Sequence, residues 1–371
     1  MSKITLTTPT IVQVVSYYPP HLGGMENVAA RIAEGLVDKG YTVSVYTSDI
    51  GYSQNAVPNA KARVHYLKSI EFAHTPILFS LFFRLLALPR HALIHLHVSQ
   101  AFSPEIVYLI SKLKKIPYIA HIHVDVDASG PFGFLLKPYK KWFLKRVLKS
   151  ASKIICLSNS QKQIILKKYN ISEEKIISLR NGVDDSYFIK RTINKKDIPT
   201  ILYVGRLAPQ KNVRRLIEAY GLMKEKAQLR IVGEGEDRSA IEQLIKHLKL
   251  SRVTLVGKKS GKELIEEYKS ADVLAVPSNK EGGAPLVILE ALATGLPVVV
   301  SDIYGISELL DDSVLLVHNP SPENFATALE KVLSNFDLQK HLSCKAEEKV
   351  KTFRWDNIVT ELEKIYEEVV S

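Results

Sequence analysis

The stretch EGGAPLVILEALATGLP, from Glu281 to Pro297, is the most informative part of this sequence. It opens with a carboxylate, two glycines and a proline, and continues as an apolar run that contains Glu290. A glycine and a proline close the run, so the pattern predicts a loop that leads into a buried helix. Free N–H groups and the positive end of the dipole make a helix start a binding site for anions. With a carboxylate on each side, such a site suits a ligand with a diphosphate and several hydroxyls, as in a nucleotide sugar.

A second segment, VGRLAPQKNVRRLIEAY, places two cations directly after a predicted strand. Gly205, Arg206 and Lys211 lie in the loop that follows the apolar residues 201–204. Open α/β sheets bind ligands at the carboxyl ends of their strands. An arginine can bind phosphate oxygens bidentately, and a lysine adds a point charge. The segment therefore predicts a phosphate site, and the alternative is a pair of solvated loop residues.

Strands and helices alternate along both halves of the chain, which argues for parallel sheets covered by helices. A third strand–loop–helix unit, LRIVGEGEDRSAIEQL, carries Gly233 after its strand. Strands are expected at 11–16, 42–47, 64–67, 93–97, 118–123, 153–157, 200–204, 229–232, 253–256, 273–276, 297–301 and 313–317. A polar stretch from Ile189 to Pro199 reads as a linker. The expected fold class is α/β, with two doubly wound Rossmann-like domains facing a cleft, at residues 1–188 and 189–354.

Together these segments resemble the retaining glycosyltransferases of family four, which have the GT-B fold. The GG-x-E loop of that family is matched by Gly23, Gly24 and Glu26, and PYIAHIHVDVD places His123 after the fourth strand of the family pattern. NGVD, at residues 181–184, matches the entry to the interdomain linker, and FRWDNIVTELEKIYEEV matches the closing helix. The resemblance covers nearly the whole chain. It implies that a helix at 355–371 crosses back to the first, acceptor-side domain, and that the second domain binds the nucleotide sugar.

The resemblance implies a retaining, metal-independent transferase of the hexosyltransferase type, which uses a nucleoside-diphosphate sugar and a hydroxyl acceptor. The frequency of uridine in the family implies a UDP-sugar, and the acceptor would be a lipid, a glycan or a small metabolite. No cofactor or metal is expected, because Arg206, Lys211 and the helix start near Leu286 would carry the charge of the leaving group.

The resemblance also assigns roles to individual residues. His123 would hydrogen-bond the donor sugar, Glu281 would accept from sugar hydroxyls, and Glu290 would accept from both ribose hydroxyls. The implied catalytic residues are His123, Arg206, Lys211 and Glu281. The implied donor-binding residues are Gly23, Gly24, Gly205, Gly233, Gly283, Ala284, Leu286 and Glu290. The acceptor candidates are Glu26, Asp125 and Asp127.

The acidic motif departs from the family pattern. Eight residues lie between Glu281 and Glu290, one more than usual, and Pro285 removes one backbone N–H from the loop. Because Glu290 keeps its register with the apolar face of the helix, we expect the loop before it to follow a different path. That path makes the implied contact of Glu281 with the sugar less secure than the implied contact of Glu290 with the ribose.

Two H-x-H pairs, His95/His97 and His121/His123, stand on predicted strands. Alternate residues of a strand share one face, so each pair resembles a metal clamp. The preferred interpretation places both pairs at strand ends on the rim of the cleft. Asp125 and Asp127 have the D-x-D spacing of a metal motif, but the resemblance puts no metal in the acceptor domain.

Composition is that of a globular protein of two domains: 371 residues, 46% hydrophobic and 24% charged. Cys156 and Cys344 lie far apart, which suggests free thiols in a reducing, cytoplasmic compartment. The N-terminus lacks a signal-peptide pattern, and no apolar run is long enough to span a bilayer.

The net charge of +11 is concentrated in the first half of the chain. Residues 1–190 contain 24 Lys or Arg against 12 Asp or Glu, a balance of +12, and the remainder is near neutral. Leu135, Tyr139, Phe143 and Val147 form an apolar stripe, beside a stripe of lysines at 137, 141, 145 and 149. This helix and the apolar run 76–89 suggest peripheral binding to an anionic membrane surface. The alternatives are a solvated lysine face and a helix buried under the first sheet.

Two other functions fit parts of the sequence. A nucleotide-sugar 2-epimerase shares the expected fold, but the GG-x-E loop and the Arg206 and Lys211 pair follow the transferase pattern. A basic protein that binds membrane or nucleic acid without catalysis explains the charge but not the phosphate site. No nucleic-acid motif is present, so no nucleic-acid partner is expected.

Overall fold

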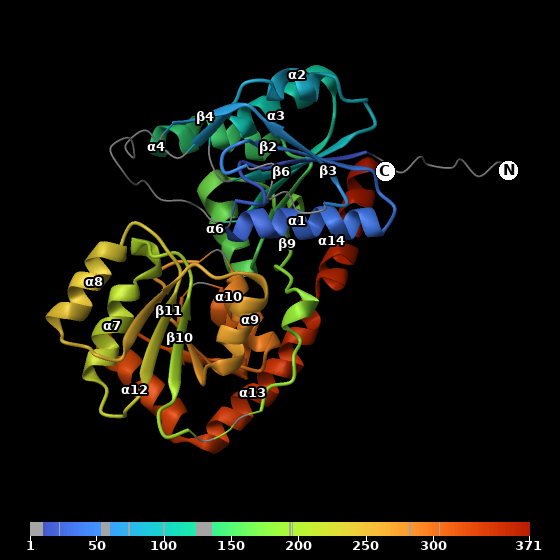
Figure 1. The fold of residues 1–371 in the computed structure, drawn as a ribbon. Helices are drawn as coiled ribbons and strands as arrows, with labels where there is room; N and C mark the ends of the chain where they lie inside the picture. The colour runs from blue at the N-terminus through green and yellow to red at the C-terminus, as the bar shows by residue number, and fades with distance from the viewer. Residues whose placement is uncertain are drawn as a thin grey trace. The chain divides into compact units, whose positions relative to one another are not determined.

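The computed structural model describes residues 10–21, 23–52, 60–72, 75–98, 101–123, 136–192, 194, 196–281, 283–303 and 305–371. The chain divides into two compact units (Figure 1). The first unit comprises Met1–Arg180 together with Trp355–Ser371, and the second comprises Asn181–Arg354. The closing helix therefore belongs to the first unit, and the predicted linker at 189–199 lies inside the second.

The first unit contains a seven-stranded parallel sheet in the order β3-β2-β1-β6-β7-β8-β9. Its strands are β1 (Ile11–Val14), β2 (Val43–Ser48), β3 (Arg63–Leu67), β6 (Leu93–Val98), β7 (Tyr118–Ile122), β8 (Lys153–Cys156) and β9 (Ile176–Ser178). The chain builds β1, β2 and β3 in one direction and then returns to place β6 on the other side of β1. The order therefore reverses between β1 and β6, which is where doubly wound sheets bind ligands.

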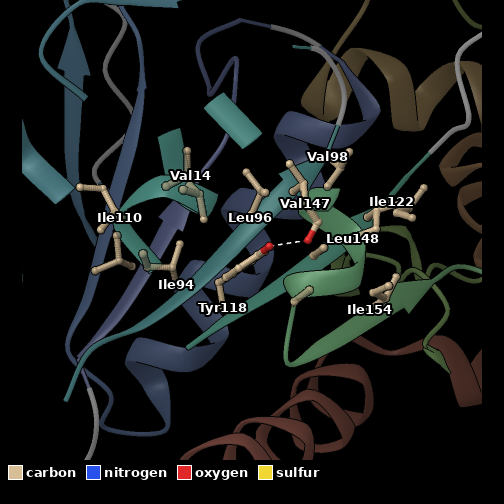
Figure 2. Close-up of a cluster of buried hydrophobic side chains, with 14 of the residues drawn as sticks. Val14, Ile94, Leu96, Val98, Ile110, Tyr118, Ile122, Val147, Leu148 and Ile154 are labelled. Carbon is tan, nitrogen blue, oxygen red and sulfur yellow. Dashed lines mark hydrogen bonds between the residues drawn. The ribbon is translucent and has the colours of Figure 1, made fainter. Parts of the chain in front are cut away.

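One face of this sheet carries the larger apolar core. Val14, Leu96 and Tyr118 point into it from neighbouring strands (Figure 2). The helices that cover it are α2 (Leu81–Leu86), α3 (Ser103–Lys114), α5 (Lys145–Ser150) and α6 (Asn159–Tyr169). The Tyr118 hydroxyl donates to the carbonyl of Val147 on α5, so the phenol is buried without losing its hydrogen bond.

The opposite face packs against α1 (Gly24–Asp38) and α14 (Trp355–Val370), which contact each other. A Cβ on Gly35 would lie 2.7 Å from the Cγ2 of Val359, so the close approach of the two helices requires a glycine here. Figure 1 shows α14 beside α1 although they come from opposite ends of the chain. The alternation of side chains along the strands turns Gln13 and the four histidines of the H-x-H pairs toward this helical layer.

The second unit repeats the same architecture with six parallel strands in the order β12-β11-β10-β13-β14-β15. They are β10 (Thr200–Val204), β11 (Gln228–Val232), β12 (Val253–Gly257), β13 (Val273–Val276), β14 (Val298–Ser301) and β15 (Leu315–Val317). The helices are α7 (Val213–Leu222), α8 (Arg238–His247), α9 (Gly261–Ser270), α10 (Leu286–Ala293), α11 (Ile306–Leu310), α12 (Pro322–Ser334) and α13 (Phe336–Val350). The order reverses between β10 and β13.

Both faces of the second sheet are buried, because apolar side chains alternate between two clusters. One cluster lies under α7, α8 and α12, and the other lies under α9, α10 and α13. The two-sided burial accounts for the continuous apolar runs of these strands. Both predicted Rossmann-like sheets, and each strand expected from the sequence, are confirmed.

Two segments differ from the sequence prediction. The apolar run 76–89 is not one buried helix: β5 (Thr75–Leu78) pairs antiparallel with β4 (Ser69–Phe72), and only the short helix α2 follows. Leu81 and Leu85 are buried beneath α2, while Phe83 on its other side is 68% exposed. The run is divided between the core and the surface, so its composition alone does not determine its burial.

The lysine-rich helix also differs from the predicted pattern. It consists of α4 (Leu136–Tyr139), a π-helical turn (Lys140–Leu144) and α5. The N–H of Lys145 donates to the carbonyl of Lys140, an i to i−5 bond that inserts one residue into the turn. Phe143 of the predicted stripe is therefore 55% exposed and Leu144 is buried in its place, whereas Val147 is buried as expected.

None of the helices in the described part of the chain combines the length and the apolar character needed to cross a bilayer. Both cysteines are free; Cys156 is buried in β8, and Cys344 is exposed on α13.

Candidate functional site in each unit

The strand order brings two predicted loops of the second unit together. The loop after β10 carries Arg206 and Lys211, and the loop after β13 carries Glu281 and leads into α10. Because β10 and β13 are adjacent and parallel, both loops leave the same edge of the sheet. The backbone N–H of Asn279 donates to the carbonyl of Gln210 at 2.9 Å and fastens one loop to the other.

Lys211 and Glu281 form a close ion pair at this edge. The Nζ of Lys211 lies 2.5 Å from the Oε1 of Glu281, and the two side chains are 21% and 9% exposed. The extra residue before Glu290 therefore does not carry Glu281 away from the predicted phosphate ligand. A lysine ammonium has three N–H donors, so Lys211 can hold Glu281 and still offer donors to a phosphate oxygen.

Arg206 is held less firmly. Its Nη2 lies 3.0 Å from the Oε2 of Glu236, and the two side chains are 64% and 50% exposed. Exposed ion pairs are worth about 0–1 kcal/mol, so an incoming diphosphate can compete with Glu236 for the guanidinium. The structure therefore shows Arg206 and Lys211 on one loop, each with a carboxylate partner that the sequence analysis did not assign to it.

Two glycines let the ends of β10 and β11 approach closely. Gly205 and Gly233 have φ values of +154° and +145°, which favour glycine. A Cβ on Gly233 would lie 1.9 Å from the carbonyl oxygen of Gly205, so no side chain fits there. Tyr203 supports the same turn, because its hydroxyl donates to the carbonyl of Arg206 at 3.0 Å.

Glu290 lies on α10 and is held by buried phenols. Tyr268, fully buried on α9, donates its hydroxyl to the Oε2 of Glu290 at 2.7 Å. Burial raises the pKa of Glu290 to about 7, against hydrogen bonds from Tyr268 and Tyr187 that lower it. The carboxylate is therefore poised to change its charge near neutral pH, and a ligand that donates to it would favour the ionised form.

The start of α10 is the predicted anion site, and this role stays a prediction. Pro285 precedes the helix, and its carbonyl accepts from the N–H of Ile288 at 3.0 Å. The first N–H groups of a helix, here those that begin at Leu286, have no acceptor within the helix itself. Gly283 and Ala284 are buried in the turn before it, so the backbone and not side chains forms the approach to the helix start.

In the first unit, Gly23 and Glu26 are fitted to each other. Gly23 precedes α1, and a Cβ on it would lie 2.2 Å from the Oε2 of Glu26. Glu26 is buried in the first turn of α1, and its Oε1 lies 2.9 Å from the Nδ1 of His21. Gly24 is the exposed first residue of the helix. A side chain at position 23 would therefore displace the Glu26 carboxylate from its present position, and the acceptor role of Glu26 stays a prediction.

His123 directly follows the carboxyl end of β7, as expected, but all four histidines of the H-x-H pairs are buried. His95, His97, His121 and His123 are 0%, 2%, 2% and 7% exposed. Their side chains stack under the layer formed by α1 and α14, and the Tyr366 hydroxyl on α14 lies 2.5 Å from the Nδ1 of His95. Burial lowers the pKa of His95 and of His123 to about 3, so these imidazoles are neutral at physiological pH.

Asp125 and Asp127 lie outside the described residues, so their role also stays a prediction. The sequence did not predict the partners of Glu290, which are Tyr268 and Tyr187, or the partners of the histidines, which include Gln13 and Tyr366. The H-x-H spacing was the only available signal for the histidine cluster. The spacing of residues along the sequence does not predict partners that come from distant helices.

Comparisons with known proteins identify the family. The model of group 1 glycosyl transferases matches residues 185–349, and that of glycosyltransferase family 4 matches residues 22–187. A glycosyltransferase of Methanocaldococcus jannaschii is 28% identical, and the match covers 96% of this chain and 97% of that protein. The Escherichia coli UDP-Gal:α-D-GlcNAc-diphosphoundecaprenol α-1,3-galactosyltransferase is 27% identical over 84% of this chain and 85% of its own.

The fold comparison agrees with the family models. The crystal structure of the Anabaena protein HepE in complex with UDP and glucose superposes with a TM-score of 0.80 at 17% identity, covering 97% of this chain and 99% of that one. The two family models lie end to end on the two units and favour neither an epimerase nor a non-enzymatic binding protein. The chain belongs to the family-four, group 1 glycosyltransferases of the GT-B fold, which transfer sugars from nucleotide sugars.

Proposed function

We propose that this enzyme transfers a sugar from a UDP-sugar to a hydroxyl acceptor with retention at the anomeric carbon and without a metal ion. The observation that carries the proposal is the Lys211–Glu281 pair at the β10/β13 edge, beside the start of α10. A cation, a carboxylate and a helix start at one sheet edge match the diphosphate and hydroxyls of a nucleotide sugar.

In this proposal the second unit stabilises the leaving group. Lys211, Arg206 and the N–H groups at the start of α10 carry the charge that develops on the diphosphate as the glycosidic bond breaks. Glu281 accepts from sugar hydroxyls, and Glu290 accepts from the ribose. The first unit supplies His123, which hydrogen-bonds the donor sugar.

The comparisons support, by analogy, the choice of donor and acceptor. The E. coli relative is named for a UDP-galactose donor and a lipid-linked acceptor, and the structure of HepE contains UDP and glucose. We therefore propose UDP as the nucleotide and a glycan or lipid-linked glycan as the acceptor.

Donor hydrolysis followed by proton NMR tests the reaction without knowledge of the acceptor. The full chain is incubated with UDP-glucose, UDP-galactose or UDP-N-acetylglucosamine, with and without EDTA. We expect one donor to yield UDP and a sugar whose α-anomer appears first, at a rate that EDTA does not change. A β-anomer first would contradict retention, and activity that EDTA removes and manganese restores would contradict metal independence. A 2-epimer as product would identify an epimerase.

The affinity for UDP is expected to depend on the charge of Glu290. Ribose hydroxyls donate to the ionised carboxylate, whose pKa in the free protein is about 7. Protonation therefore competes with binding, and the Kd should rise roughly tenfold between pH 8 and pH 6. Calorimetric titration measures this. Glu290→Gln should bind UDP more weakly at pH 8 and lose the pH dependence, whereas Glu242→Gln on α8 should behave as the wild type. A Kd that does not change with pH in the wild type would remove Glu290 from the ribose site.

We further propose that the first unit docks peripherally on an anionic membrane. Trp142 is 58% exposed in the π-helical turn, beside a surface hollow that it lines together with Lys141, Lys145, Arg146 and Lys149. Helix α3 contacts both this segment and α2, so the exposed Phe83 of α2 belongs to the same helical layer. Exposed aromatic residues among lysines suit the interface of an anionic bilayer.

Vesicle sedimentation tests the docking. The enzyme should bind vesicles of phosphatidylglycerol at low salt and dissociate as salt rises, because each lysine contributes roughly 1 kcal/mol within a Debye length of about 8 Å. Exchange of Lys141, Lys145 and Lys149 for Glu should abolish binding without changing UDP affinity. The charge-matched control replaces the exposed Lys246, Lys258 and Lys262 of the second unit and should still bind. Equal loss in both triple variants would show a non-specific charge effect and contradict a docking surface.

A further inference from the structure

The buried histidines of the first unit form two separate hydrogen-bonded chains. In one chain, Tyr366 bonds to His95, and the Nε2 of His95 lies 3.1 Å from the Nδ1 of His121. In the other chain, the side-chain amide of Gln13 lies 3.1 Å from the Nε2 of His97, whose Nδ1 lies 2.9 Å from the Nε2 of His123. Only the second chain reaches the residue that the proposed function places at the donor sugar.

The backbone of α1 fixes the orientation of the Gln13 amide. One orientation places its nitrogen 3.0 Å from the carbonyl oxygen of Ala29 and its oxygen 3.2 Å from the N–H of Ala33. The reverse orientation would place the amide oxygen of Gln13 against the carbonyl oxygen of Ala29, and its amide N–H against the N–H of Ala33. Since the side chain is fully buried, these contacts decide the orientation, and the second N–H of the amide points at His97, 3.1 Å from its Nε2.

The proton positions on both imidazoles follow from this orientation. The Nε2 of His97 accepts from Gln13, so it carries no proton. Burial and the neighbouring histidines hold the pKa of His97 well below its usual value, and the ring is therefore neutral with its one proton on Nδ1. That Nδ1–H donates to the Nε2 of His123, and His123, which is also neutral, must carry its own proton on Nδ1.

We propose that Gln13 and His97 are positioning residues that fix His123 as a hydrogen-bond donor through its Nδ1–H. The Nδ1 is the ring nitrogen that does not contact His97, and His123 directly follows the carboxyl end of β7. An N–H at this atom would recognise an oxygen acceptor of the donor sugar. This last step rests on the proposed function, whereas the proton positions rest only on the contacts within the first unit.

The hydrogen-bonded series from Gln13 through His97 to His123 is called the relay below. Long-range 1H–15N spectra of the full chain labelled with [15N]histidine test it directly, because the two neutral tautomers have distinct nitrogen shifts. We expect His123 and His97 to be protonated on Nδ1 at pH 7.5. Gln13→Met, which removes the amide donor at similar volume, should leave both rings as mixtures of tautomers. His97→Asn retains an N–H near the position of Nδ1 and should preserve the His123 tautomer.

His95→Gln is the matched control, since it alters a buried histidine of the other chain. It should leave the spectrum of His123 unchanged. Protonation of His123 on Nε2 in the wild type, or an unchanged His123 tautomer in Gln13→Met, would overturn the relay.

A metal ion is the competing occupant of the cluster. The ligand atoms of His95, His97 and His121 all lie within 4.8 Å of one another, so these residues could bind a metal. Zinc at one equivalent in elemental analysis of the purified chain, with loss of the Nδ1–H signal of His97, would also overturn the relay.

Kinetics separate the relay from the proposed function. With the donor identified by hydrolysis, Gln13→Met should lower kcat/KM for the UDP-sugar about tenfold and leave the Kd for UDP unchanged, because UDP lacks the sugar. If the NMR result is as expected but kcat/KM does not change, the relay stands and the contact of His123 with the sugar fails. If His123 of the wild type carries its proton on Nε2, the relay is rejected whatever the kinetics show.

Discussion

Replacement of Lys211 by Ala is expected to lower kcat by a hundredfold or more. The ammonium is proposed to stabilise charge on the departing diphosphate, and removal of one such contact costs on the order of 3 kcal/mol of transition-state stabilisation. Arg206→Ala should cause a loss of similar size. Although Arg206 is exposed and paired with Glu236 in the free protein, the diphosphate offers it a more highly charged partner.

The structure provides the controls for these variants. Lys211→Ala also leaves Glu281, which is 9% exposed, without its cation, so part of its effect could come from a shifted loop. Glu281→Gln combined with Lys211→Ala removes that unpaired charge and should remain as inactive as Lys211→Ala alone. Arg214→Ala on α7, at an arginine that is 73% exposed and paired with Glu218, should leave turnover unchanged. Wild-type turnover in both Lys211→Ala and Arg206→Ala would remove the phosphate site from this loop.

Acidification below pH 6.5 is expected to destabilise the first unit strongly. The pKa values of His95, His97, His121 and His123 are all lowered by burial, so the unfolded chain binds more protons than the folded one. The stability from neutral imidazoles is thus present above pH 6.5 and is lost as the pH falls. At pH 5.5 each histidine costs about 1.4 kcal/mol, and four together approach the roughly 5–15 kcal/mol that stabilises a typical domain.

The stability of the second unit should change in the opposite direction over part of this pH range. The pKa of Glu290 is raised to about 7, so its protonation favours the folded state as the pH falls from 7 toward 4.5. At acidic pH the first unit should therefore unfold at a lower urea concentration than the second unit.

Tryptophan fluorescence isolates the first unit, because Trp142 and Trp355 both belong to it. Urea titrations at pH 7.5 and 5.5 should show its midpoint fall sharply. His121→Gln should flatten this pH dependence, whereas His247→Gln on the surface of α8 should not. A midpoint that is equal at both pH values would mean that the four imidazoles can accept protons in the folded state.

The fold was predictable because local patterns decide it. Apolar runs buried on both faces, such as 273–276 and 298–301, identify parallel strands without knowledge of their neighbours. The hairpin β4–β5 was not predictable, because its residues Ile70 and Phe72 are 61% and 57% exposed and resemble no buried strand. The π-helical turn was also missed, since the lysines keep a spacing of four while the buried side shifts from Phe143 to Leu144.

The site was predictable as far as the sheet order determines it. Loops after β10 and β13 must meet at one edge, which brings Lys211 to Glu281 in spite of the extra residue in the acidic motif. The partners of Glu290 and of the histidines depend on how α9 and α14 pack on their sheets. Spacing along the sequence contains no signal for contacts such as Tyr366 with His95, which lie 271 positions apart.

The position of α14 has a consequence for synthesis on the ribosome. All strands of the first sheet have been translated once the ribosome reaches residue 180. Helix α14, by contrast, follows the entire second unit along the chain. At about 5–20 residues per second, translation of the intervening segment takes roughly 10–40 s. During that interval the second unit, which is continuous from Asn181 to Arg354, can complete its fold. The nascent first unit meanwhile exposes the flank of α1 and the imidazole of His95 that α14 will cover, so the part of the protein translated first is the part finished last.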